Sequence, residues 1–84
     1  MSKRLQDLRD ELADIESRLK DATAAHNKAK DTFGRFEGTA GTPLWCKLRD
    51  EVDHTLTHRR VLKAVWHRLS ADVLEQLNKE HGNG

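Results

Sequence analysis

The sequence has few of the residues that cross-link, kink or anchor a chain. It contains one cysteine, one proline, no tyrosine, two phenylalanines and two tryptophans. A lone cysteine, Cys46, cannot form a disulfide within the chain, and the first residues lack the apolar core of a signal peptide. We therefore expect a reducing, cytoplasmic location. No stretch approaches the roughly 18 consecutive apolar residues of a membrane-spanning helix, so we expect no membrane partner.

An excess of charge of one sign is also missing. The 84 residues include 15 Lys and Arg against 14 Asp and Glu, for a formal net charge of +1. Net charge therefore selects neither nucleic acid nor an acidic partner, and the distribution of charge has to decide. The length fits one domain, and a chain this short rarely buries a core worth more than a few kcal/mol. Self-association or a binding partner is therefore expected.

What the sequence does contain is two matched series of mainly apolar residues, each spaced alternately by three and four. The first is Leu5, Leu8, Leu12, Ile15, Leu19, Ala22, His26, Ala29, Phe33, Phe36, and the second is Trp45, Leu48, Val52, Thr55, Arg59, Leu62, Trp66, Leu69, Val73, Gln76. This spacing is typical of the seam between two helices. Folding the chain back at residues 40–41 pairs the two series without a slip. The predicted fold is all-α, an antiparallel two-helix coiled-coil hairpin, which we expect to dimerise into a four-helix bundle.

The boundaries follow from residues that begin and end helices. We predict a single hairpin over 1–78, with helix 1 at about 3–37, a turn at 38–42, helix 2 at about 43–78, and a flexible tail at 79–84. Thr42 is suited to cap helix 2 before Pro43, and Gly38 or Gly41 is suited to a left-handed conformation. The turn end should be the best-packed part, because large apolar residues gather there: Phe33, Phe36, Leu44, Trp45 and Leu48.

Polar residues interrupt the seam near its middle. The fold-back places His26 opposite Thr55 and Arg59 opposite Ala22. Buried polar residues at such positions often fix the register of paired helices at a cost in stability, which is the interpretation we favour here.

Residues 54–71 contain no acid, and they carry several basic side chains. Arg60, Lys63 and His67 are spaced to share one helical face, which could track a phosphate backbone. The alternative that we favour is pairing with acidic residues that the fold-back brings alongside, namely Asp10, Glu11, Asp14, Glu16 and Asp21. Such pairing would help to fix the antiparallel register. An acidic protein partner is a third interpretation.

Candidates for metal binding or catalysis are weak. His54 and His58, four residues apart, could hold a metal from one helical face, but the intervening residues include no glutamate of a hydrolytic motif. Cys46 belongs to the same series of positions, yet it lies about 18 Å from His58 along a helix axis. A thin hairpin offers no pocket that excludes water. We expect no metal, no cofactor and no enzymatic activity.

The apolar residues of helix 2 outside the seam suggest a function in binding. We predict a non-enzymatic protein-interaction module, an adaptor, regulator or inhibitor, that acts through the outer face of helix 2 as a homodimer or with another protein. The predicted interface is Leu56, Val61, Val65, Arg60, Lys63 and Arg68. The alternative is a small dimeric nucleic-acid-binding bundle that uses Arg59, Arg60, Lys63, His67 and Arg68.

Overall fold

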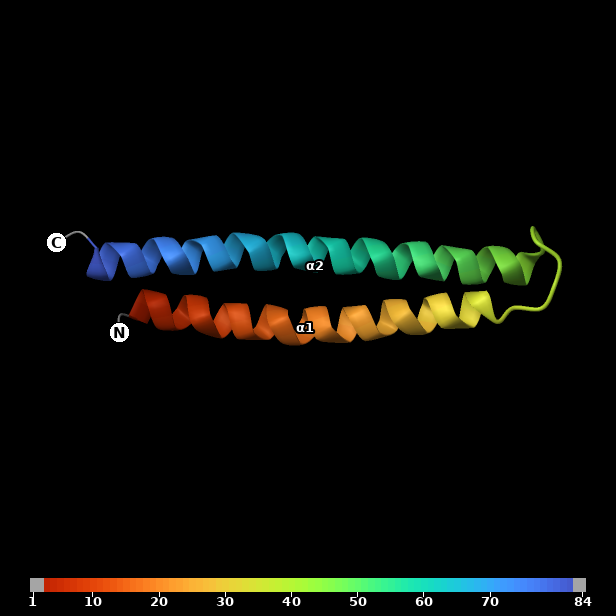
Figure 1. Cartoon of the computed structure of the whole chain (residues 1–84), viewed down its shortest axis with the longest axis horizontal. Helices are drawn as coiled ribbons and strands as arrows, with labels where there is room; N and C mark the ends of the chain where they lie inside the picture. Colours follow the sequence, from red (N-terminus) through yellow and green to blue (C-terminus); the bar gives the residue numbers. More distant parts are fainter. Residues whose placement is uncertain (1–2, 83–84) are drawn as a thin grey trace.

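The computed structural model describes residues 3–82 and contains two helices in that range, with no strand. Helix α1 spans Lys3–Gly34 and helix α2 spans Pro43–His81. The prediction of an all-α chain with two helices is confirmed. Figure 1 shows α1 and α2 lying side by side along their whole length, with the start of α1 and the end of α2 at one end of the molecule and the turn at the other. The result is a rod of 65 × 15 × 14 Å.

The turn between the helices uses the glycine and the capping threonine that the sequence analysis predicted. Helix α1 ends at Gly34, slightly before the predicted boundary, and the Phe36 N–H donates to the Phe33 carbonyl at 3.2 Å, which closes the last turn. Gly41 has φ of 89°, a conformation that favours glycine. The Thr42 hydroxyl then accepts from the Trp45 N–H at 3.4 Å, so the predicted cap of α2 is confirmed.

The residues of both predicted seam series are buried or half-buried, and none is exposed. The buried members are Leu5, Leu8, Ala22, His26, Ala29, Thr55 and Leu62, each at most 9% exposed. A hydrogen bond of 3.0 Å between His26 Nδ1 and Thr55 Oγ1 joins the helices at the rung where the fold-back paired these two residues. This bond gives the register of the two helices, in which Ala22 falls opposite Arg59.

The large apolar residues beside the turn are not the most buried part of the interface, so that prediction was wrong. Leu5 and Leu8 are each 2% exposed, whereas Leu44 beside the turn is 54% exposed. Phe33 and Trp45 contact each other with ring centroids 5.6 Å apart but stay half-buried. Two helices can enclose leucines between them, whereas rings of this size extend beyond the contact and meet no third element that would cover them.

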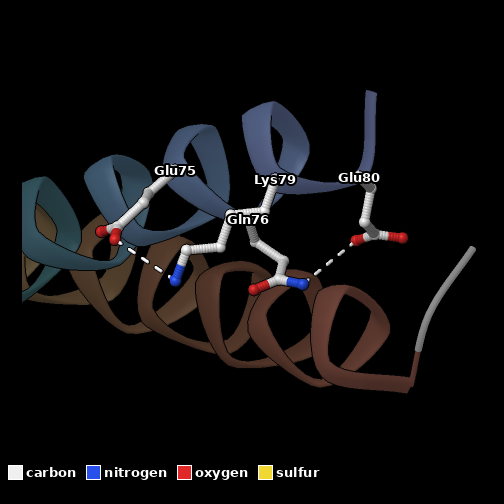
Figure 2. A network of polar contacts seen from close by, with 4 residues as sticks. All are labelled: Glu75, Gln76, Lys79 and Glu80. Carbon is white, nitrogen blue, oxygen red and sulfur yellow. Dashed lines mark hydrogen bonds and ion pairs between the residues drawn. The ribbon is translucent and has the colours of Figure 1, made fainter. Parts of the chain in front are cut away.

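Helix α2 also continues past the predicted boundary, through residues 79–81. The Lys79 Nζ atom pairs with Glu75 Oε1 at 3.5 Å, and Gln76 Nε2 donates to Glu80 Oε2 at 3.4 Å (Figure 2). The Gly82 N–H donates to the Asn78 carbonyl at 2.7 Å and ends the helix. Residues 83–84, the rest of the predicted flexible tail, lie outside the described residues. Over residues 3–82, neither helix combines the length and the apolar content needed to cross a bilayer.

Candidate functional site

The six predicted interface residues all lie on α2, but they fall on two different sides of it. Leu56 and Val65 are nine residues apart, which at about 100° per residue places them on opposite sides of the helix. Leu56, Arg60 and Lys63 follow one another at spacings of four and three, and so do Val61, Val65 and Arg68. The structure therefore brings together two triplets rather than one patch.

The side that carries Val65 has a row of shallow hollows where α1 and α2 meet. They are lined by two sets of residues spaced by seven: Arg4, Glu11, Arg18, Ala25 and Thr32 of α1, and Glu51, His58, Val65, Asp72 and Lys79 of α2. We call this the groove side. Its two sets hold three basic and three acidic residues, not counting the histidine.

Small residues of α1 open the two hollows nearest the turn. Ala25 lines both of them, together with the buried Ala22 in one and the buried Ala29 in the other. Their short side chains leave space beside Leu48 and Leu62 of α2. The sequence analysis did not single out Ala25, which is exposed.

The opposite side carries Leu56 and Lys63. The Trp66 Nε1–H donates to Glu16 Oε1 at 3.1 Å, so Glu16 of α1 faces this side. Residues at sevenfold spacing from these are Arg9, Glu16, Thr23 and Lys30 of α1, and Arg49, Leu56, Lys63, Ser70 and Leu77 of α2. We call this the basic side, because its two sets hold four basic residues and one acid.

Interhelical charge pairing, which the sequence favoured for residues 54–71, does not form. The ion pairs described in residues 3–82 join Asp14 to Arg18, Asp31 to Arg35 and Glu75 to Lys79, always within one helix. Arg60, Lys63, His67 and Arg68 are exposed and make no ion pair within that range. The His67 ring packs edge-on against Trp66 at 5.1 Å, and Arg68 lines a hollow of the groove side beside Val65.

A polar rung crosses the interface between the two sides. His26 is 5% exposed and Thr55 is 8% exposed. The Thr55 hydroxyl lies 2.8 Å from the Glu51 carbonyl and 3.0 Å from the Val52 carbonyl. A hydroxyl has one proton, so when Thr55 donates it to either carbonyl, its oxygen accepts from the Nδ1–H tautomer of His26. The bond links the backbone of α2 to a side chain of α1.

Arg59 is the polar residue of the seam that lacks a partner. Its side chain is half-buried, its Nε atom is buried without a hydrogen bond, and its other nitrogens bond to nothing within residues 3–82. The register places it opposite Ala22, whose short side chain leaves space for the guanidinium stem. A buried donor without an acceptor is costly, which makes this residue unusual in an otherwise satisfied interface.

The predicted metal and thiol candidates do not converge. His54, His58 and Cys46 are exposed, and within residues 3–82 no group of three or more His, Cys, Asp or Glu side chains is close enough to hold a metal ion. The Cys46 thiol contacts the Gly41 carbonyl at 3.8 Å in the turn. What the described residues offer is therefore two elongated surfaces of different charge.

Comparisons of this chain with protein-family models, with curated proteins and with solved structures give no match.

Proposed function

We propose that the chain is a protein-interaction module, an antiparallel coiled-coil hairpin that pairs with a second copy through its groove side to form a four-helix bundle. The observation that carries this proposal is the row of hollows, because it runs along most of the interface and is lined by small and aliphatic residues together with charged ones. An adaptor or regulator would present the remaining surface of such a dimer to its target.

The sevenfold spacing supports the coiled-coil part of the proposal. Residues seven apart line the groove side from Arg4 to Thr32 on α1 and from Glu51 to Lys79 on α2. A straight helix would drift by about 20° per heptad, so one set of heptad positions would leave the groove within the length of this rod. Left-handed supercoiling keeps the same positions at the groove throughout.

Charge supports a second copy as the occupant. The groove-side sets hold equal numbers of acidic and basic residues, which suits a partner of equally mixed charge. The basic side would instead set like charges against like charges if two copies met there. Two helical stripes also form a small core, and a dimer adds buried apolar surface that the single hairpin lacks.

Exposed residues of the groove side provide the test. Ala25 is exposed in the single hairpin but lines two hollows, so Ala25→Arg should leave the hairpin folded and block a second copy. Ala24→Arg is the matched control, because Ala24 is also exposed and lines none of the hollows described for residues 3–82. Sedimentation equilibrium should give twice the chain mass for the parent and for Ala24→Arg.

Ala25→Arg should sediment at the mass of one chain while its helical circular dichroism is retained. A parent protein that sediments as one chain would rule out the proposed dimer. If Ala25→Arg and Ala24→Arg both sediment at twice the chain mass, the dimer interface does not lie on the groove side.

A further inference from the structure

The basic side presents cations from both helices to the same region. The Trp66–Glu16 hydrogen bond and the contact of His67 with Trp66 place the two helices' residues there together. Lys30 of α1 and Lys63 of α2 belong to its sevenfold sets. Lys20 and Arg60 lie in the next rows outward, four residues after Glu16 and four after Leu56.

These cations have no acidic partner among residues 3–82. Lys20, Lys30, Arg60 and Lys63 are exposed and make no ion pair within residues 3–82. The acid of the sevenfold sets, Glu16, accepts a hydrogen bond from Trp66. Asp53 lies in the outer row seven residues before Arg60, so four cations stand against two acids in this central part of the surface. Their charge is therefore available to an external anion.

Arg59 adds a cation that the seam holds in place at a cost. An aliphatic residue at this position would fill the space opposite Ala22 without leaving the buried Nε unpartnered. Arg59 directly precedes Arg60 and is four residues before Lys63, so it extends the same cluster of positive charge. A ligand that supplies an acceptor would explain why a charged residue occupies this rung.

The aromatic residues indicate which anion fits. Phe33, Phe36, Trp45 and Trp66 are all half-buried in the interface, and the chain has no tyrosine. Proteins that hold single-stranded nucleic acid stack bases on accessible aromatic rings, which this surface does not offer. A duplex presents closely spaced phosphates to a row of cations and needs no stacking.

We propose that the basic side, through Lys20, Lys30, Arg59, Arg60 and Lys63, binds the phosphate backbone of a nucleic-acid duplex without reading its sequence. The site lies on the side away from the groove, so it does not depend on the proposed dimer. A dimer formed through the groove side would carry two such surfaces facing outward.

Fluorescence anisotropy with labelled DNA and RNA duplexes of about 20 base pairs tests the proposal. The parent should bind at low salt and lose affinity steeply between about 50 and 200 mM salt. Arg60→Glu/Lys63→Glu should weaken binding at least about tenfold and lower the slope of log affinity against log salt by about two. Both residues are exposed, so helicity should be unchanged.

Lys28→Glu/Lys47→Glu is the matched control, since both lysines are exposed, lie away from the basic side, and change the net charge equally. It should weaken binding less than about threefold, because only long-range charge is altered. Arg59→Met should also weaken binding while raising the melting temperature, a combination that a merely structural residue would not give. If DNA and RNA duplexes both bind the parent and both bind Arg60→Glu/Lys63→Glu more weakly, the protein recognises the phosphate backbone that they share. If only one type binds, recognition also depends on the groove geometry of that duplex.

Three results would overturn the proposal. The first is no binding of either duplex at low salt, and the second is equal loss in the two double variants. The third is binding of poly-glutamate as tight as that of the duplexes, which would indicate an acidic polypeptide as the partner instead. The same titration with the Ala25→Arg variant, which we expect to be a single chain, distinguishes failure of duplex binding from failure of dimer formation.

Discussion

At the scale of single residues, the stability of the interface depends on whether its buried polar groups have hydrogen-bond partners. Thr55 uses its hydroxyl proton on the backbone of α2 and offers its oxygen to His26. Losing the histidine leaves Thr55 bonded to that backbone. Losing the threonine hydroxyl leaves a buried imidazole N–H without an acceptor, and the free energy cost of that loss is the larger one.

Thr55→Val should therefore lower the free energy of unfolding by about 1–3 kcal/mol. Thr57→Val is the control, because Thr57 is exposed and its hydroxyl donates only to the Asp53 carbonyl. It should change stability by less than about 0.5 kcal/mol. Urea titrations followed by circular dichroism measure both values, and equal values would mean that the His26–Thr55 bond contributes nothing.

At the scale of the helix, the ends are fixed by local bonds. The Thr42 side chain accepts from the Trp45 N–H, Pro43 needs no donor at the first helical position, and Gly41 takes the φ of 89° that leads into the cap. At the other end of α2, the Glu75–Lys79 and Gln76–Glu80 contacts lie along the last turns (Figure 2). Such pairs add a few tenths of a kcal/mol each, so the cap at Thr42 is the stronger of the two devices.

Thr42→Ala should lower stability by about 1 kcal/mol, which for a chain of this size corresponds to about 4–8 °C in melting temperature. Thr42→Ser keeps the acceptor and should behave nearly as the parent does. Thr39→Ala changes an exposed threonine of the same turn and serves as the control. A melting temperature of Thr42→Ala that matches Thr39→Ala would show that the cap is dispensable.

At the scale of the whole molecule, stability depends on one long and thin interface. The buried apolar side chains of residues 3–82 are few, and they are spread from Leu5 to Leu62 rather than gathered in one centre. A core of this kind is worth only a few kcal/mol, so an unpaired charge at a buried position should exceed the total, unlike the half-buried Arg59.

Leu62→Asp should abolish most of the helical circular dichroism, because Leu62 is 9% exposed at the middle of the interface. Leu74→Asp is the control on the same helix, where the side chain is 63% exposed, and it should keep the parent spectrum. Both variants are measured at one protein concentration, since association shifts apparent stability. Full helicity in Leu62→Asp would contradict an interface made by this residue.

The interaction surfaces show where reasoning from the sequence reached its limit. The six predicted interface residues were grouped because three of them are apolar residues of helix 2 outside the seam and the other three are basic residues near them, yet Leu56 and Val65 lie on opposite sides of the helix. Ala25 was not identified, because an alanine carries no chemical signal in a sequence. Its significance comes from the space left between α1 and α2, which depends on what stands opposite.

The sequence alone determined the two helices, the turn with its cap and the rung that pairs His26 with Thr55, because spacing by three and four, glycine, proline and capping residues act locally. Only the tertiary structure decided that Leu5 and Leu8 are more buried than the large apolar residues beside the turn. It also decided that, within residues 3–82, the acids of α1 leave Arg60 and Lys63 unpaired and Arg59 Nε is buried without a partner. These features depend on distances and enclosure across the interface. Spacing along one chain does not specify them.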